Sequence, residues 1–304
     1  VGRGAAGIIV LPDPDVTAAW EDLRSKTGSP TDEYADPSPA ALRIAGLFVT
    51  KPAFVRALFA GQLGVPPGME LVGDETTKGF ELTGVTLSLH AAITDVSMPA
   101  WNVLGLVRGT DPVARDEYVV VSAHLDSTTP RKPGEVYNGA DDDASGCAGV
   151  MEVARAVAAR PLRRSVIFAL FTGEEAAIAG SRHFVSRCPV PLEKIVADVD
   201  MDMIGRTDEA SQADRAHYAL DSDRITPELS RFVREVNERT VRWPLKYENE
   251  SGNSDNLAFD FKGIPGVSFY SGHHPDVNKP TDDPEKLDYD KAEKIARLAY
   301  EVTA

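Results

Sequence analysis

Two continuous apolar runs constrain the fold of this 304-residue chain more than any other feature. Residues 118–123 read Tyr-Val-Val-Val-Ser-Ala, and residues 165–172 read Ser-Val-Ile-Phe-Ala-Leu-Phe-Thr. Such runs are typical of strands buried on both faces, as in parallel sheets. Helical periodicity follows each run, over 144–160 and 176–187. The alternation predicts an α/β fold, with a mostly parallel mixed sheet and helices on both faces.

Further patterns extend this α/β arrangement to the end of the chain. Strands are predicted over 194–201, 217–220 and 266–270, and helices over 227–240 and 289–302. Residues 1–87 differ, because Gly, Pro and Asp interrupt them often; strands are expected there over 7–12, 41–49 and 85–90, with a helix over 51–63. The sequence therefore predicts two domains: a small accessory domain, 1–87, and a main domain, 88–304.

Composition excludes several classes of partner. The net charge of −15 opposes binding to nucleic acid or to an anionic membrane. No apolar run approaches the roughly 18 residues of a membrane span. The two cysteines, Cys147 and Cys188, are too few for a disulfide framework, so they are expected to be buried thiols, with a single disulfide as the alternative. The chain starts at Val1 without a signal peptide, and the sequence does not tell what preceded it.

Polar side chains follow three of the predicted strands. His124-Leu125-Asp126 follows the first, Gly173-Glu174-Glu175 the second, and Asp202 closes the third; the segment 139–146 (GADDDASG) precedes the first helix. Each motif alone is commonplace, since acids cap helices and favour helix starts. Together they converge on the carboxyl edge of the sheet, where ligands bind in open α/β folds. Crowded carboxylates repel unless a cation is present, and His with carboxylates suits zinc.

In order and spacing, these four segments resemble the bacterial di-zinc aminopeptidases, a zinc exopeptidase family that includes glutamate carboxypeptidases and, more distantly, glutaminyl cyclases and transferrin receptor. The resemblance covers residues 101–304. It implies a phosphorylase/hydrolase-like zinc exopeptidase fold and a secreted or periplasmic protein. The later part of residues 1–87 resembles the protease-associated domain inserted in many members, which makes the first domain a partial one.

The resemblance also implies roles for individual residues. The implied metal ligands are His124, Asp142, Glu175 and Asp202, with Asp142 bridging two zinc ions. Glu174 is the implied general base, and Asp126 is implied to orient the imidazole of His124. A cis peptide is implied between Asp142 and Asp143, and Asp200 has no family role.

One implied ligand is replaced in this chain. The family's C-terminal loop reads close to H-P-D-Y-H-x-P-[ST]-D, whereas residues 274–282 read HPDVNKPTD, so Asn278 stands at the ligand position. A second family motif, R-S-D-H, reads Asn-Ser-Asp-Asn over 253–256. An amide oxygen is a poorer zinc ligand than imidazole. We therefore expect one tight zinc, with a weak or vacant second position at Asn278, unless His273 or His274 replaces the missing ligand.

The favoured function is that of a zinc-dependent exopeptidase, most simply an aminopeptidase acting on peptide or aminoacyl substrates. One alternative is a catalytically impaired or silent relative used for binding; another is a single-zinc acyl transfer such as glutaminyl cyclisation. Other nucleophiles are excluded: no G-x-S-x-G elbow, P-loop or dinucleotide fingerprint occurs, and the acidic run before Cys147 would raise its pKa. The sequence leaves open the recognised terminus, the side-chain preference and the oligomeric state.

Overall fold

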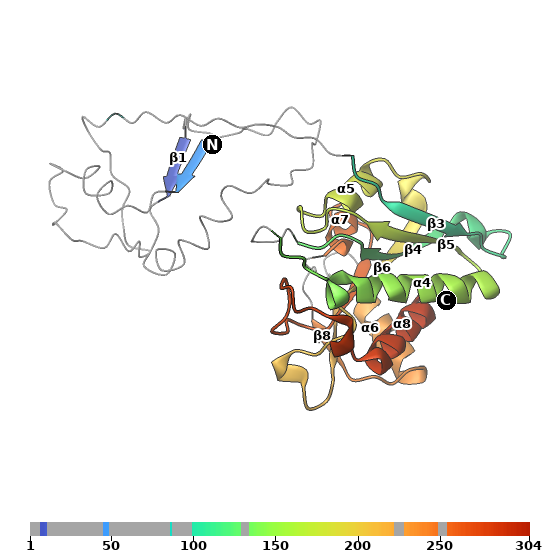
Figure 1. Cartoon of the computed structure of the whole chain (residues 1–304). Coiled ribbons are helices and arrows are strands. Elements are labelled where there is room, and N and C mark those ends of the chain that lie inside the picture. The colour runs from blue at the N-terminus through green and yellow to red at the C-terminus, as the bar shows by residue number, and fades with distance from the viewer. Residues whose placement is uncertain are drawn as a thin grey trace, which may run out of the picture. The chain divides into compact units, whose positions relative to one another are not determined.

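The chain divides into two compact units. A computed structural model describes residues 99–128, 134–221, 228–248 and 254–304, together with residues 7–10, 45–48 and 86. One unit comprises residues 1–30 and 35–98, and the other comprises 31–34 and 99–304. In the first unit, β1 (Gly7–Val10) pairs in parallel with β2 (Ala45–Phe48), at two of the predicted strands (Figure 1). The helix predicted over 51–63, most of the strand predicted over 85–90 and the predicted boundary after residue 87 lie outside the described residues.

The second unit is built on a seven-stranded mixed sheet in the order β3-β5-β4-β6-β9-β7-β8. The four strands β5, β4, β6 and β9 are parallel, whereas β3 and β7 run antiparallel to their neighbours β5 and β9. This confirms the predicted α/β class with a mixed sheet. The strands are β3 (Val103–Val107), β4 (Tyr118–His124), β5 (Ser165–Phe171), β6 (Ile195–Asp202), β7 (His217–Asp221), β8 (Leu245–Glu248) and β9 (Gly266–Tyr270).

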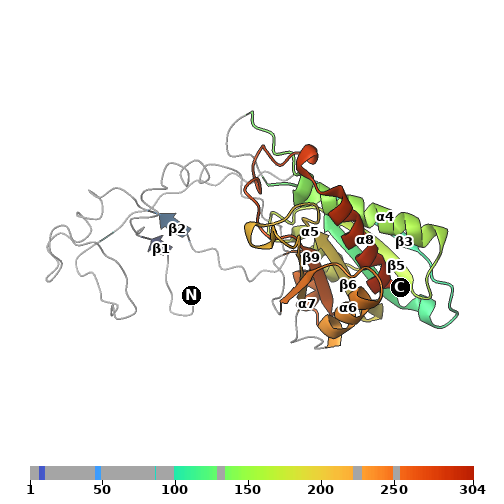
Figure 2. The same ribbon diagram turned by 90° about the horizontal axis from the view of Figure 1, so that it is seen from below.

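Helices cover both faces of this sheet (Figures 1 and 2). The helices are α4 (Gly146–Ala159), α5 (Ala179–Ser186), α6 (Glu228–Arg239), α7 (Asn256–Asp260) and α8 (Tyr289–Thr303). Val119 and Val121 of β4 point to a core shared with α4, α6 and α8, and Val120 between them points to a core shared with α5 and α7. Full burial of one such side chain contributes about 1.5–3 kcal/mol, so the two-sided covering explains why the strands read as unbroken apolar runs.

The second core, between the sheet and the two short helices, is aromatic. The ring of Phe171 at the end of β5 lies 5.5 Å from that of Phe184 in α5 and 6.3 Å from that of Phe259 in α7, measured between centroids. All three side chains are buried. This cluster fixes the carboxyl end of β5, the strand that delivers Glu174 and Glu175.

Among the strands and α-helices of the described residues, three were not predicted, and one helix was predicted too long. β3, β8 and α7 have only four or five residues each, too few for a periodicity to emerge. The helix predicted over 176–187 begins only at Ala179, because Ala177 and Ile178 adopt left-handed backbone conformations with φ of 61° and 52°. Residues 174–178 therefore form a loop that leads from the strand into the helix.

Two further sequence expectations can be compared with the structure. Both cysteines are free thiols, as expected, although each is half-buried rather than fully buried. None of the helices in the described ranges is long and apolar enough to cross a membrane.

Candidate metal centre

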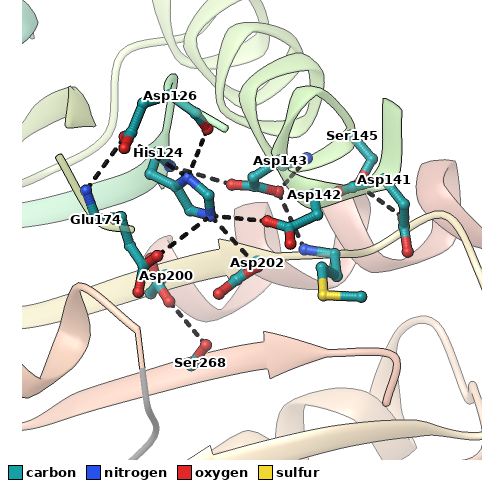
Figure 3. A network of polar contacts seen from close by, with 12 residues as sticks. His124, Asp126, Asp141, Asp142, Asp143, Ser145, Glu174, Asp200, Asp202 and Ser268 are labelled. Atoms are coloured by element: carbon teal, nitrogen blue, oxygen red, sulfur yellow. Dashed lines mark hydrogen bonds and ion pairs between the residues drawn. The ribbon is translucent and has the colours of Figure 1, made fainter. Parts of the chain in front are cut away.

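The carboxyl ends of three neighbouring strands bring four of the sequence-predicted residues together (Figure 3): His124, Asp142, Glu174 and Asp202. His124 is the last residue of β4 and Asp202 is the last residue of β6, while Glu174 and Glu175 follow β5. Asp142 enters from the turn before α4. One ligand atom each from His124, Asp142 and Asp202 lies within 4.8 Å of the others, a spacing that can hold a metal ion.

Nε2 of His124 faces three carboxylates. It lies 3.2 Å from Oδ1 of Asp142, 3.7 Å from Oδ1 of Asp202 and 3.9 Å from Oε2 of Glu174. Nδ1 lies 3.0 Å from the backbone carbonyl of Asp126 and so carries the hydrogen in the neutral ring, which leaves a lone pair on Nε2. Either a proton or a metal ion can occupy this position between the imidazole and the carboxylates, and the donor set fits zinc.

The pKa values of the site reflect the same crowding of negative charge. Burial alone would lower the pKa of His124, but the carboxylates of Asp142 and Asp202 outweigh it and hold that pKa well above its ordinary value. Burial, reinforced by nearby carboxylates, raises the pKa of Glu174 to about 9. Burial and the charge of Asp142 raise the pKa of Glu175 to about 7. A bound cation would relieve this repulsion.

Three consecutive acids, Asp141, Asp142 and Asp143, have different surroundings. Asp142 faces His124, whereas the carboxylates of Asp141 and Asp143 accept hydrogen bonds from backbone amides. The Asp142–Asp143 peptide is cis, as the family resemblance implied. Asp143 is buried and accepts hydrogen bonds from the backbone amides of His124 (3.1 Å), Gly146 (3.0 Å) and Met203 (3.0 Å). It thereby fastens the end of β4, the start of α4 and the residue after β6 to one carboxylate. The sequence motif contained Asp143, but its anchoring role was not predicted.

Asp141 anchors the loop that follows β6 and the C-terminal turn. Its Oδ1 accepts hydrogen bonds from the amide of Gly205 (2.6 Å) and the hydroxyl of Ser145 (3.0 Å). Its Oδ2 lies 3.1 Å from Nε2 of His274, and both side chains are fully buried. Nδ1 of His274 accepts a hydrogen bond from the amide of Asp276. Both ring nitrogens of His274 therefore face groups other than the metal cluster, whereas His273 is exposed and packs edge-on against Tyr270.

Asp126 contacts the site through two different groups. Its backbone carbonyl, at 3.0 Å, is closer to Nδ1 of His124 than its carboxylate oxygen, which lies 3.8 Å away. The carboxylate instead accepts a hydrogen bond from the backbone amide of Glu174 at 3.1 Å. The orientation of the imidazole thus depends chiefly on the main chain of Asp126, and the side chain positions the loop that carries Glu174.

The remaining predicted position, Asn278, lies on a turn fastened to the Asp142 segment. The carboxylate of Asp282 accepts hydrogen bonds from the amides of Asp141 (2.9 Å) and Asp142 (3.1 Å). Within the described part of the chain, Oδ1 of Asn278 and Oε1 of Glu175 are buried without a hydrogen-bond partner. Asp282 was part of the family motif, but the sequence did not indicate that it would hold the Asp142 backbone.

Two other side chains near the site, Asp200 and Cys147, contact groups of the surrounding protein. Asp200 is fully buried inside the sheet core and accepts a hydrogen bond from the hydroxyl of Ser268 at 2.7 Å (Figure 3). The hydroxyl of Ser122 donates a second hydrogen bond to it at 3.2 Å. The thiol of Cys147 donates to the backbone carbonyl of His124. Burial, followed by the charge of Asp143, raises the pKa of Cys147 to about 12, which excludes an activated thiolate.

Comparison with known proteins identifies relatives of this fold and sequence. The model of Peptidase family M28 matches residues 102–303. Aminopeptidase YwaD of Bacillus subtilis is 26% identical over 248 residues, covering 76% of this chain and 50% of that protein. A protein of Arthroderma benhamiae named "Probable leucine aminopeptidase" is 26% identical over 203 residues, covering 62% of this chain and 54% of its own length.

A similar fold occurs in BSAP, a zinc aminopeptidase from Bacillus subtilis. Its structure superimposes with a TM-score of 0.57 at 22% identity, covering 66% of this chain and 48% of BSAP. The matched part of this chain spans about half the length of the two aminopeptidases compared by sequence, YwaD and the Arthroderma benhamiae protein.

Proposed function

Because this chain belongs to Peptidase family M28, we propose that it is a zinc-dependent exopeptidase that releases residues from the amino ends of peptides. One observation carries the proposal: the buried Nε2 of His124 faces the carboxylates of Asp142 and Asp202 at the sheet edge, with Glu174 beside them. The names of the relatives, which are aminopeptidases, favour the amino end over the carboxyl end.

The proposed zinc ligands are His124, Asp142 and Asp202 at one position, and Asp142 with Glu175 at the other. Zinc bound there would lower the pKa of a coordinated water and polarise the scissile carbonyl. Glu174 accepts the proton of the attacking water and donates it to the leaving amine. The Asp126 carboxylate holds the Glu174 backbone during these transfers.

The zinc content is part of the proposal. Asn278 replaces the imidazole that the family places at the second position, so we expect one tight zinc per chain and a weak second position. Residues 1–87 are proposed to be a partial protease-associated-like domain, and the protein is proposed to act outside the cytoplasm; both rest on the resemblance described above. The alternatives, a binding protein without turnover and a glutaminyl cyclase, remain separable by experiment.

The test compares three substrates with the purified 304-residue chain: leucine p-nitroanilide, an amino-blocked peptide with a free carboxyl end, and a peptide that begins with glutamine. Release of nitroaniline that stops after zinc chelation and resumes when zinc is added supports the aminopeptidase. Cleavage of the amino-blocked peptide alone would indicate a carboxypeptidase. Release of ammonia from the peptide that begins with glutamine would indicate a glutaminyl cyclase. Tight zinc binding without any turnover would indicate the binding protein.

A further inference from the structure

The strand β9 ends beside the candidate metal centre with a tyrosine. Tyr270 is the last residue of β9, as His124 is the last residue of β4 and Asp202 the last of β6. We infer that Tyr270 is a further catalytic residue, whose hydroxyl donates a hydrogen bond to the carbonyl oxygen of the scissile peptide bond. The inference rests on the proposed function, because it takes peptide hydrolysis at the cluster of His124, Asp142 and Asp202 as its starting point.

The strand register places Tyr270 next to Asp202 on the same face of the sheet. In the parallel pair β6–β9, Asp202 stands opposite Tyr270, and paired residues of neighbouring strands point to the same side. In the pair β4–β6, Ser122 stands opposite Asp200. His124 and Asp202 each follow two residues later, so their side chains also share that side. The three strand ends therefore form one row, in which neighbouring strands lie about 4.8 Å apart.

The electrostatic surroundings of Tyr270 agree with this placement. Burial is the largest cause that raises the pKa of its phenol, and the charges of Asp202 and Asp142 follow. The phenol thus lies within the field of two carboxylates of the cluster. The ordinary phenol pKa of about 10 already keeps the hydrogen on the oxygen at neutral pH. Tyr270 therefore remains a donor whether or not a cation offsets the carboxylate charges.

The cluster at the sheet edge otherwise presents acceptors to a substrate. The ionised carboxylates of Asp142, Glu174 and Asp202 carry no hydrogen to donate. When water attacks a peptide carbonyl, the π electrons of the C=O bond move onto the oxygen, and hydrogen-bond donors in fixed positions stabilise that charge. Tyr270 supplies such a donor beside the cluster. It retains its hydrogen, so the proton of the water still passes to Glu174 and then to the leaving amine.

Neighbouring rings fix the orientation of the Tyr270 side chain. The centroid of its ring lies 6.1 Å from that of Tyr218 in β7 and 5.9 Å from that of His273, which packs edge-on. Tyr218 is itself held, because its hydroxyl donates to Oδ2 of Asp208 at 2.6 Å. That bond uses the one hydroxyl hydrogen of Tyr218. Tyr270, which is half-buried, is thus the phenol of this pair that can donate to a substrate.

The experiment compares the zinc-loaded 304-residue chain with Tyr270→Phe, which removes the hydroxyl and keeps the ring contacts with Tyr218 and His273. We expect kcat for leucine p-nitroanilide to fall about a hundredfold, the lower end of the range for one donor to a developing oxyanion, with KM nearly unchanged. Zinc content and thermal unfolding should match the wild type, because Tyr270 is not among the proposed ligands. The matched control, Tyr289→Phe, removes the hydroxyl of an exposed tyrosine that donates to the carbonyl of Pro284, and should leave kcat unchanged.

A binding measurement tests the same hydrogen bond without turnover. Leucine phosphonic acid carries a tetrahedral anion in place of the carboxyl group, so it resembles the tetrahedral intermediate of hydrolysis. Isothermal titration calorimetry should show that Tyr270→Phe weakens its binding by about the factor by which kcat falls, because such an analogue gains the interactions that are made in the transition state. The binding of leucine, with its planar carboxylate, should weaken much less.

The outcomes separate the inference from the proposed function. An unchanged kcat in Tyr270→Phe, a loss confined to KM, or equal weakening of leucine and leucine phosphonic acid would overturn the inference alone, since the wild type would still hydrolyse the anilide. A wild-type chain that binds the phosphonic acid through Tyr270 but hydrolyses no substrate would contradict the proposed function alone. A zinc-loaded chain that neither binds the phosphonic acid nor hydrolyses the anilide would contradict both.

Discussion

The carboxylate of Asp126 accepts a hydrogen bond from the backbone amide of Glu174, with 3.1 Å between Oδ1 and N. The backbone carbonyl of the same residue lies 3.0 Å from Nδ1 of His124. Asp126 therefore connects the imidazole of the candidate metal centre to the residue proposed as the general base. The side chain of Asp126 holds the Glu174 backbone, whereas its main chain contacts His124. A substitution at position 126 removes the side-chain contact and leaves the main-chain carbonyl in place.

We predict that Asp126→Ala lowers kcat by about tenfold to a hundredfold, because the Glu174 loop loses its anchor. Zinc content should be unchanged, since the contact to His124 uses the main chain. Turnover of leucine p-nitroanilide and metal analysis measure the two effects. The control, Asp126→Asn, keeps an acceptor for the Glu174 amide and should retain most of the activity; equal losses in both variants would indicate that the charge matters and the anchor does not.

Glu174→Gln should abolish peptide hydrolysis while zinc content and thermal stability stay as in the wild type. Removal of a general base typically costs about 10²–10⁴ in rate. The matched variant, Glu175→Gln, should instead weaken metal binding at the second position, because its carboxylate is proposed as a ligand. If Glu174→Gln loses metal and Glu175→Gln keeps it, the two roles have been assigned in the wrong order.

Asn278→His should raise both the zinc content of the isolated protein and its turnover. The wild type should be weakly active as isolated, and added zinc or cobalt should increase its rate, because the second position holds metal poorly without imidazole. Titration of both proteins with zinc, followed by anilide hydrolysis, provides the comparison. Two tight zincs in the wild type, with no gain in the variant, would show that another group already supplies the missing ligand.

The stability of the protein should depend on pH through His217. This residue is fully buried in β7, and within the described residues neither ring nitrogen has a hydrogen-bond partner. Burial and the charge of Lys291 hold its pKa well below the ordinary 6.5. The folded state thus binds fewer protons than the unfolded state, and the stability contributed by a neutral His217 is complete above pH 6.5 and decreases below it.

We therefore expect the free energy of unfolding of the wild type, relative to His217→Leu, to fall by about 1.4 kcal/mol per pH unit below this value. Urea unfolding of zinc-saturated proteins at several pH values measures the difference, since effects of the metal site cancel between the two proteins. His183→Leu, at an exposed position, is the control and should parallel the wild type. If the free energy of unfolding of His217→Leu changed with pH in parallel with that of the wild type, the prediction would be contradicted.

Removal of residues 1–87 should leave the metal centre intact. Every site residue described above lies between positions 124 and 282, within the second compact unit. A chain that begins at Ser88 should bind zinc like the 304-residue chain, as metal analysis and thermal unfolding would show. Loss of zinc or of the fold would refute this prediction. A chain that begins at Tyr118 also lacks β3, which pairs with β5, and should be markedly less stable.

The sequence predicted the class of the fold and the convergence of the main polar residues for a specific physical reason. Strands buried on both faces, such as β4 and β5, leave unbroken apolar runs, and the residues after them must meet at one edge. His124, Asp142 and Asp202 are brought together in this way. Short elements such as β3 and α7 escaped prediction, because four or five residues do not establish a period.

The anchoring network could not be predicted from the sequence. Asp143 and Asp282 hold backbone amides that are far away in the chain, and a carboxylate that accepts from an amide leaves no pattern at the amide's own position. The engagement of His274 with Asp141 is equally long-range. The sequence therefore left open whether His274 or His273 supplies a ligand, and the structure gives His274 another partner.

Asp282 fastens the backbone of Asp141 and Asp142 from a position close to the end of the chain. During synthesis, His124, Asp142, Glu174 and Asp202 all leave the ribosome before this carboxylate does. The nascent protein thus contains the proposed metal ligands well before it contains the carboxylate that holds their backbone. Productive capture of metal is expected only after residue 282 has been made, when every strand of the seven-stranded sheet is available to fold.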